Sequence, residues 1–461
     1  MNTENYRGSV AIVLGLTDTD EKIPAASGRI STQEGDASEI FAKSQDREKN
    51  AKLISKVTRS GHNSTIEHTV FNIAFQDVSV FVEQFLIEFR LASYTVKSRR
   101  YVDFRKCGFY VPFLGNKELE DKFSETMEYL FNEYTAFVDA GVPKEDARFL
   151  LPYCLRSNFY CTVNARELLH MLRSMLFGRG SEFKELYDLG MQIFSQIEKL
   201  TPGIVTDFYK RRPEKSDKIA LGYMFNNYEE EKSSDAAVEL LSYPVDAEKC
   251  VARSALIWTR QYTPDAIEKI ISDDSNVNKI IDTVLESSRP RPLETVNYTF
   301  RINGVSLSTI THFARHRMQS LMVPSLTLTD RTKYIIPETV KNAGLLERYE
   351  NAFAKMNELY KYLKENGCTE EQAVYCQLSG NTLDIVSSMN GRELMLFMRL
   401  RTCTRAQWEV RDFAMEMLRK LREVSPAIFS KYGPSCYIAN CPEGAFSCGK
   451  AAELKEYFKN F

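Results

Sequence analysis

Hydrophobic and polar residues follow the same order in two parts of the chain. Each part opens with a short hydrophobic run that is typical of a β-strand, at Val10–Leu14 and at Val238–Leu241. Each has a second such run later, at Val70–Phe75 and at Val296–Ile302. This pattern predicts at least two strands in each part.

Helical periodicity surrounds these runs. Two pairs of segments have it: 77–90 with 306–317, and 164–177 with 390–401. Asp77 or Ser79 is a suitable N-cap for the first of these helices. We therefore expect an α/β (α+β), helix-rich fold with a modest sheet in each part. The strand order does not follow from the sequence.

The two parts are also related residue by residue. Matching residues recur 227 positions apart: Glu67 with Glu294, Arg90 with Arg317, Ser93 with Ser320, and Ser98 with Ser325. Later the separation is 226, where Asn164-Ala-Arg166 corresponds to Asn390-Gly-Arg392. Chance identities would scatter over many separations, so the chain is a tandem duplication.

The charged and serine-rich stretch from Tyr228 to Asp235 is suited to a linker between the copies. We expect a first repeat at residues 1–228 and a second at 229–461, each large enough to bury its own core.

Composition narrows the class of protein. The 60 basic and 62 acidic residues give a formal net charge of −2, so no global positive field attracts nucleic acid or an anionic membrane. No stretch has the roughly 18 uncharged apolar residues of a membrane span, and no signal peptide is evident. The ten cysteines then indicate reduced thiols and a cytoplasmic protein. Cys436, Cys441 and Cys448 lack zinc-ribbon spacing, so we expect no metal.

The candidate chemistry lies in a cationic segment of the second repeat. Arg315, His316 and Arg317 stand at an expected helix end, with Ser320 and Ser325 just beyond. Arginine grips phosphate with two parallel hydrogen bonds, so this group suits an anionic ligand. A solvated helix end with ordinary cations is the alternative.

Further motifs surround that segment in one repeat or the other. They are Glu67-His68, Arg148-Phe-Leu-Leu-Pro152, the helices starting at Asn164-Ala-Arg166 and Asn390-Gly-Arg392, and Arg401 followed by Ala406-Gln-Trp-Glu409. Together they resemble the flavin-dependent thymidylate synthases, whose signature is Arg-His-Arg-x-x-Ser-x-x-x-x-Ser-x-Arg. The resemblance covers most of the chain, twice.

The resemblance implies a FAD-dependent thymidylate synthase-like methyltransferase. Its reaction is the reductive methylation of dUMP to dTMP, with NADPH and methylenetetrahydrofolate as co-substrates, and the chemistry belongs to the cofactors. The implied FAD contacts are Arg315, His316, Arg317, His68, Asn164, Arg166, Asn390 and Arg392. The implied nucleotide contacts are Ser98, Arg100 and Arg148, with Ser93, Ser320 and Ser325. Arg401 is the implied catalytic residue, a fixed positive charge against the pyrimidine.

The two repeats have lost different parts of the signature. The first keeps His68, Arg100 and Arg148 but has Glu88-Phe89 and Met175 where the family has Arg-His and the helix-end arginine. The second keeps Arg315-His316-Arg317 and Arg401 but has Thr295, Thr327 and Val374 at the other positions. Family enzymes are similar homotetramers with shared active sites. We therefore expect a homodimer, a pseudo-tetramer of repeats, with composite sites; independent drift of both copies is the alternative.

Two other functions remain open. Val96 and Val323 stand where the family motif has an acidic residue, which allows a related flavoenzyme acting on C5 of another uracil nucleotide. A non-catalytic flavin- or nucleotide-binding relative is the other. Direct nucleic-acid binding is disfavoured because no basic stripe is present.

Overall fold

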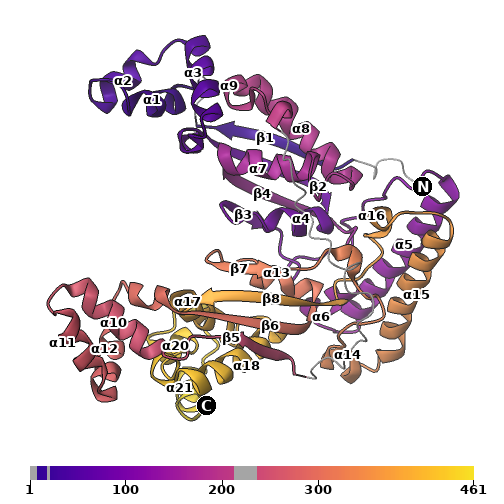
Figure 1. Ribbon diagram of the computed structural model, residues 1–461. Helices are drawn as coiled ribbons and strands as arrows, with labels where there is room; N and C mark the ends of the chain where they lie inside the picture. The colour runs from indigo at the N-terminus through magenta and orange to yellow at the C-terminus, as the bar shows by residue number, and fades with distance from the viewer. Residues whose placement is uncertain (1–7, 18–20, 212–235) are drawn as a thin grey trace, which may run out of the picture. The chain divides into compact units, whose positions relative to one another are not determined.

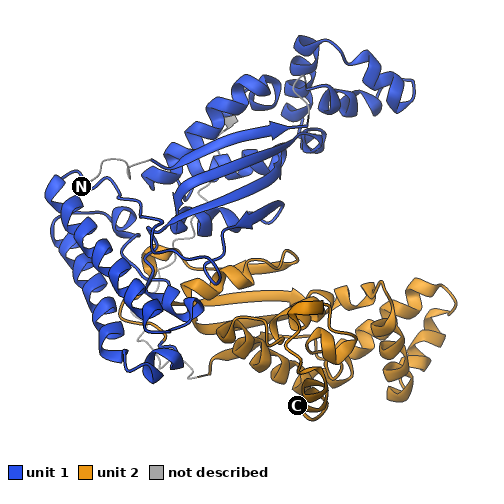
Figure 2. Ribbon diagram, turned by 180° about the vertical axis from the view of Figure 1, so that it is seen from behind, with its two compact units in different colours: residues 1–231, 336–380 blue, residues 232–335, 381–461 orange. Residues whose placement is uncertain are grey.

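The computed structural model describes residues 8–17, 21–211 and 236–461 (Figure 1). The chain divides into two compact units (Figure 2): unit 1 comprises residues 1–231 and 336–380, and unit 2 comprises 232–335 and 381–461. The expected linker at 228–235, and with it the boundary at 228/229, lies outside the described residues.

Each unit contains one four-stranded antiparallel sheet. Unit 1 has the order β1-β2-β4-β3, with β1 Val10–Leu16, β2 Val70–Ser79, β3 Ala92–Val96 and β4 Arg156–Asn164. Unit 2 has the order β5-β6-β8-β7, with β5 Val238–Ser242, β6 Asn297–Ser306, β7 Gln319–Met322 and β8 Thr382–Asn390. The identical strand order confirms the tandem duplication and the helix-rich α+β fold.

Strand pairing confirms the alignment of the repeats. Ser93 lies opposite Thr162, and Ser320 lies opposite Ser388 in the other sheet. The four hydrophobic runs of the sequence all fall in β1, β2, β5 and β6, and the central strands β2 and β6 continue to the serines that cap the next helices.

Helices and 3₁₀ turns surround the sheet of unit 1. From the first repeat they are α1 Lys22–Ile30, α2 Ala37–Lys43, α3 Arg47–Arg59, η2 Asn63–His68, α4 Val80–Ile87, α5 Lys117–Asp139, α6 Lys144–Ala147, η3 Arg148–Leu150, α7 Ala165–Leu176, α8 Lys184–Leu200, α9 Pro202–Val205 and η4 Tyr209–Arg211. From the second repeat they are α14 Glu338–Asn342, α15 Leu346–Glu365 and α16 Glu370–Ala373.

Unit 2 has a corresponding set of helices. They are α10 Ala247–Thr259, α11 Pro264–Ile271, α12 Asp274–Glu286, η6 Arg291–Thr295, α13 Leu307–Phe313, η7 Leu326–Leu328, α17 Gly391–Arg401, α18 Trp408–Val424, α19 Pro426–Phe429, α20 Ser435–Ile438, η8 Gly444–Phe446 and α21 Ala451–Asn460.

Two expected helices are shorter than the sequence pattern indicated. Helix α4 begins after Ser79, whose hydroxyl accepts the Val82 amide, because β2 continues through Asp77. A helix start at Asp77 is therefore wrong, and Ser79 is the N-cap. Helix α13 ends at Phe313, so Arg315 and its neighbours follow the helix rather than end it.

Unit 1 includes a helical segment of the second repeat. Helix α15 lies beside α5 (Figures 1 and 2), and Arg348 donates two hydrogen bonds to Glu133 at 3.0 and 2.9 Å. Thr339 donates to Asp146 at 2.6 Å in the same unit. The compact units therefore do not coincide with the repeats of the sequence.

A buried carboxylate ties strand, helix and neighbouring loop together in each unit. Glu185 accepts from the Ser79 amide and hydroxyl at 2.8 and 2.6 Å, and from the Tyr375 hydroxyl at 3.0 Å. Glu409 accepts from the Ser306 amide and hydroxyl at 2.7 and 2.6 Å. The two anchors occupy equivalent positions, so the duplication extends to the buried polar contacts.

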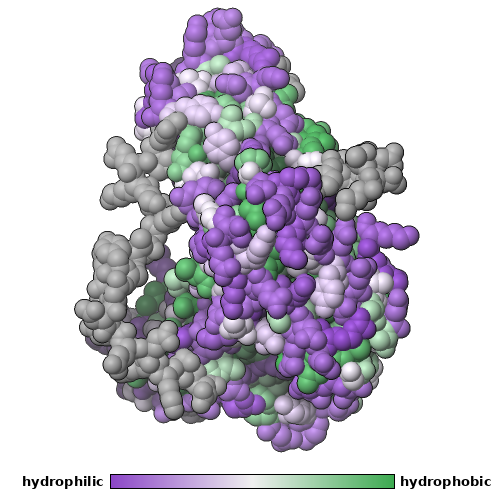
Figure 3. Space-filling model, turned by 90° about the vertical axis from the view of Figure 1, so that its right-hand side faces the viewer, coloured by the Kyte–Doolittle hydropathy of each residue, from purple (hydrophilic) through white to green (hydrophobic). Residues whose placement is uncertain are grey.

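The surface around α5 and α15 is largely hydrophilic, with hydrophobic residues in small groups (Figure 3). Among the helices that the structure describes, none combines the length and the apolar character required to cross a bilayer.

Candidate functional site

His316 and Arg401 are hydrogen-bonded to each other in unit 2. His316 follows α13 and is only 3% exposed, and its Nδ1 lies 2.9 Å from Oε1 of Glu393 in the first turn of α17. At the other end of α17, Arg401 donates from Nε to His316 Nε2 at 3.0 Å and from Nη2 to the His312 carbonyl at 2.9 Å. Sequence reasoning singled out His316 and Arg401, and the structure brings them into contact.

The hydrogen bonds assign the state of the imidazole. A guanidinium only donates, so Nε2 of His316 must carry a lone pair toward Arg401. The ring proton is then on Nδ1, where it is donated to Glu393. The result is a chain from carboxylate through neutral imidazole to guanidinium, which fixes Arg401 in one direction.

The first repeat has lost this chain. Phe89 and Met175, both buried, replace the histidine and the helix-end arginine. Phe89 packs against the ring of His170 at 5.2 Å between centroids, and His170 Nδ1 lies 3.4 Å from Oε2 of Glu167. Glu88, at the position of Arg315, pairs with Arg179 at 2.7 Å. Apolar packing and a local ion pair thus replace the cationic site.

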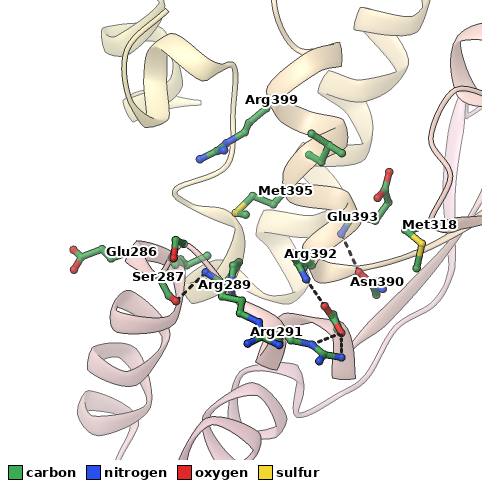
Figure 4. A pocket seen from close by; sticks show the side chains of 15 residues that line it. Glu286, Ser287, Arg289, Arg291, Met318, Asn390, Arg392, Glu393, Met395 and Arg399 are labelled. Atoms are coloured by element: carbon green, nitrogen blue, oxygen red, sulfur yellow. Dashed lines mark hydrogen bonds and ion pairs between the residues drawn. The ribbon is translucent and has the colours of Figure 1, made fainter. Parts of the chain in front are cut away.

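A pocket of about 900 Å³ opens beside α17 in unit 2 (Figure 4). Its polar lining includes Asn390 and Arg392, two of the predicted FAD contacts, and also Arg289, Arg291 and Arg399. Its apolar lining includes Leu285, Met318, Met395 and Leu396.

Sequence reasoning missed three of these arginines, although a signal for one was present. Arg392, Met395, Leu396 and Arg399 recur at the spacing of a single helical face. That spacing predicts that Arg399 lines the same groove as Arg392. Arg289 and Arg291 come from the segment around η6, and no periodicity marks them.

The equivalent groove of unit 1 is smaller. A pocket of about 320 Å³ is lined by Arg166, Leu169, His170 and Arg173 on α7, opposite Ile66 and Phe208. Arg173 lies over the Phe208 ring, 5.5 Å from its centroid. The same four helical positions therefore line both grooves, and the unit 1 groove is also lined by the aromatic ring of Phe208.

In each repeat, a glutamate of the 3₁₀ turn η2 or η6 pairs with the arginine in the first turn of the helix that lines the groove. Glu294 accepts from Arg392 at 2.6 Å and from Arg291 at 3.2 Å, and Glu67 accepts from Arg166 at 2.6 Å. The hydrogen bond from Arg392 holds the pKa of Glu294 below its ordinary value. In the free protein, Arg291 and Arg392 are thus partly neutralised.

The predicted nucleotide residues of the first repeat lie together in unit 1. Arg100 pairs through Nε with Glu145 at 3.0 Å, and Arg148 donates from Nε to the Glu145 carbonyl at 2.9 Å. The Ser98 hydroxyl accepts the amide of Arg100 at 3.3 Å. Two guanidiniums and a hydroxyl at one place suit a phosphate or a sugar.

The other expected residues fall into two groups. Asn164 and Asn390 cap α7 and α17 by accepting the amides of Glu167 and Glu393, each at 2.9 Å. The exposed residues are His68, at the end of η2, and Ser93, Arg315, Arg317, Ser320 and Ser325, which lie in strands, turns or loops.

The cysteines form no disulfide among the residues described. In that same part of the chain, no three cysteine, histidine or acidic side chains are grouped as metal ligands.

The sequence is similar to a known protein family and to several of its members. The sequence model of the family described as "Thymidylate synthase complementing protein" matches residues 13–203 and again 239–427. A flavin-dependent thymidylate synthase of Clostridium tetani is 35% identical over 248 residues, 49% of this chain and 98% of that protein. One from Geobacter sulfurreducens is 33% identical over 227 residues, 48% of this chain and 97% of that protein.

Among solved structures, a UMP/dUMP methylase of Streptomyces cacaoi bound with 5-Br dUMP aligns with 45% of this chain and 99% of that chain. The sequence identity is 22% and the TM-score is 0.38.

Proposed function

The chain belongs to the family of thymidylate synthase complementing proteins as two tandem copies, and from this premise we propose that it is a flavin-dependent thymidylate synthase. Its reaction is the methylation of dUMP to dTMP. The observation that carries the proposal is the Glu393–His316–Arg401 chain beside the arginine-lined pocket of unit 2. Family membership indicates the reaction, and these contacts hold the Arg401 guanidinium in a fixed orientation for it.

The pocket suits a flavin nucleotide. Its apolar lining offers surface for a ring system, while its guanidiniums suit phosphate groups. We assign Arg315, Arg317, Asn390 and Arg392 to hold FAD in the second repeat, with His316 positioning Arg401. His68, Asn164 and Arg166 are the corresponding candidates in the first repeat. The flavin supplies the redox chemistry when bound.

The nucleotide-binding groups come from the first repeat. Arg100 and Arg148 are held by Glu145 in unit 1, whereas the second repeat has Thr327 and Val374 at the equivalent positions. We propose that Ser98, Arg100 and Arg148 bind the phosphate and sugar of dUMP, with Ser93, Ser320 and Ser325 as further hydroxyl contacts. Arg401 of a second repeat completes the same active site.

We propose that these sites form in a homodimer, which contains four repeats. One class of site combines Arg100 and Arg148 of a first repeat with His316 and Arg401 of a second repeat. The other class combines the equivalent positions, where these residues have been lost. NADPH as electron donor and methylenetetrahydrofolate as carbon donor complete the proposal.

Arg401 is the residue that we expect to act on the reacting atoms. C5 of the pyrimidine becomes a nucleophile only when the ring carries additional negative charge, and a guanidinium already held in place stabilises that charge without reorganisation. The hydrogen bonds to His316 and to the His312 carbonyl provide that preorganisation.

The experiment is an assay of the purified full chain. We expect a protein that retains FAD and forms dTMP from dUMP, methylenetetrahydrofolate and NADPH, and that rescues a bacterium requiring thymidine. A chain that binds no flavin on reconstitution and forms no dTMP would contradict the proposal.

A second candidate substrate is tested in the same assay. Val96 and Val323 replace an acidic residue of the motif, which favours an altered nucleotide preference. UMP in place of dUMP distinguishes a related flavoenzyme from the proposed thymidylate synthase: product from UMP but not from dUMP would replace the proposal with that alternative.

A further inference from the structure

Four cysteines of unit 2 lie near one another where the end of α17 meets the C-terminal segment. Cys403 follows α17, Cys436 lies in α20, and Cys441 and Cys448 lie between α20 and α21. Helix α20 contacts both α17 and α21 (Figure 1). Burial raises the pKa of Cys436, and the nearby thiols of the other three cysteines raise it further. The fold thus gathers four thiols from separate elements.

The segment 439–450 gives two of these cysteines an unusual position. Ten of its twelve residues are exposed, and even Phe446 is 70% exposed. The two residues that are only half-exposed are Cys441 and Cys448. The amides of Phe446 and Ser447 donate to carbonyls of the same segment. The segment therefore has no apolar core of its own, and its two cysteines are the side chains turned toward the rest of unit 2.

The chain is anchored on both sides of this segment. Arg422 of α18 donates to the carbonyl of Tyr432 before it and to that of Phe458 after it, each at 3.0 Å. Phe458 and Tyr432 are both buried. Because its two ends are held, the segment has less conformational freedom to lose when Cys441 and Cys448 are drawn toward the other two thiols.

We propose that Cys403, Cys436, Cys441 and Cys448 bind one Zn²⁺ ion that fixes the C-terminal segment to the end of α17. Thiolates are preferred zinc ligands, and four of them form the closed tetrahedral coordination of structural zinc. Four residues separate Cys436 from Cys441, a spacing found in pairs of zinc ligands. The expectation of no metal rested on the spacing of three cysteines, to which the fold adds Cys403.

Zinc binding requires the exposed segment to close. In the described part of the chain no three of these sulfurs are grouped at ligand positions, so Cys441 and Cys448 must move toward Cys403 and Cys436. Metal binding of this kind is coupled to local folding, and its free energy stabilises the closed segment. Since Cys403 lies two residues after Arg401, the ion also restrains the end of the helix that carries this arginine.

The metal content of the purified, reduced full chain tests the inference. We expect about one zinc per chain by plasma mass spectrometry, and at least about tenfold less in Cys441→Ser and in Cys448→Ser, because each loses a ligand. Both substitutions lie in the exposed segment, and circular dichroism checks that the variants are folded. Cys250→Ser is the matched control: this half-buried thiol of the same unit lies outside the cluster, and its loss should leave the zinc content unchanged.

Cobalt(II) tests which atoms hold the metal. The chain is freed of metal, kept reduced and titrated with Co²⁺. We expect sulfur-to-cobalt charge-transfer absorption and the intense visible bands of tetrahedral coordination in the wild type and in Cys250→Ser, and a clear weakening of both in Cys441→Ser. Removal of zinc should lower the melting temperature of the wild type and leave that of Cys441→Ser unchanged.

Three results would overturn the inference. One is a reduced wild-type chain that carries no zinc and gives no cobalt–thiolate absorption. Another is zinc that remains in both loop variants, and the third is iron in place of zinc on the same thiols. None of these measurements involves flavin or dUMP, so the outcome is independent of the proposed function.

Discussion

At the scale of single residues, the two repeats differ at one position that follows α4 in the first repeat and α13 in the second. His316 links Glu393 to Arg401, while Phe89 at the equivalent position packs against His170. A neutral imidazole accepts a hydrogen bond from the guanidinium and donates one to the carboxylate. Phenylalanine can make neither of these hydrogen bonds. The substitution therefore removes the orientation of a cation, not only one hydrogen bond.

His316→Phe should reproduce this loss in the second repeat. We expect kcat for dTMP formation to fall by about a hundredfold, because a charge that is no longer held in place stabilises the transition state less, and KM for dUMP to change less. The reverse change in the first repeat, Phe89→His, should leave kcat near wild type because Met175 replaces the arginine there. Steady-state kinetics measures both, and wild-type turnover in His316→Phe would refute the positioning role.

Glu185 gives a prediction for pH. Burial raises the pKa of this carboxyl above its ordinary value of 4.5, although hydrogen bonds from Ser79 and Tyr375 oppose the rise. A raised folded-state pKa means that its contribution to stability is full below the unfolded pKa and falls as pH rises through the folded one.

Glu185→Gln removes this titration. We expect the substitution to lower the melting temperature more at pH 5 than at pH 7.5, as measured by thermal denaturation over that range. A larger loss at the higher pH would show that the carboxylate, not the carboxylic acid, is the stabilising form.

At the scale of elements, β2 and β6 each contain a bulge. The bulges occupy equivalent positions in the two repeats but are formed by different residues. The register shifts between Phe75 and Val78 in β2 and between Ile302 and Val305 in β6. The bulged residues are Asp77, with φ of 53°, and Gly304, with φ of 64°. The bulge turns the chain into the capping serine of the next helix, so backbone conformation here sets the start of α4 and α13.

Gly304→Ala should cost about 1 kcal/mol of unfolding free energy, because left-handed φ brings Cβ close to the following carbonyl. No atom lies within 4 Å of the added Cβ, so the cost is conformational rather than steric with neighbours. Gly15→Ala in β1 also meets nothing within 4 Å and lacks a positive φ, and it should cost less. Chemical denaturation measures the unfolding free energy of both variants. If Gly304→Ala and Gly15→Ala cost the same, the positive φ of Gly304 is not the cause of the loss.

Sequence patterns predict the repeated elements well because their signals are local. The strand runs, the serine and asparagine caps and the helix containing Arg392 and Arg401 follow from periodicity and capping chemistry. Packing of α15 beside α5 does not follow, because an amphipathic helix reveals a buried face but not its partner. The sequence also predicts that α13 continues to Arg317, whereas it ends at Phe313. Cations are favourable both in the last turn of a helix and just after it, so Arg315 and Arg317 do not mark the end.

At the scale of the whole molecule, each repeat keeps different residues of the family signature. The first repeat holds Arg100 and Arg148, with Glu145 between them, and the second holds His316 and Arg401. If active sites are composite, each repeat is free to lose what the other supplies. A homodimer is then the smallest assembly with four repeats, and we expect sedimentation or light scattering to give twice the 53.0 kDa mass of one chain.

The most direct measurement of this division is kcat/KM for dUMP in two variants at one repeat position. Arg100→Ala removes a guanidinium from the first repeat, and Thr327→Ala changes the residue 227 positions later in the second. We predict a fall of about tenfold to a hundredfold for Arg100→Ala, the loss of one charged hydrogen-bonding partner, and a value within twofold of wild type for Thr327→Ala. Full activity in Arg100→Ala, with FAD bound as in wild type, would contradict active sites shared between the repeats.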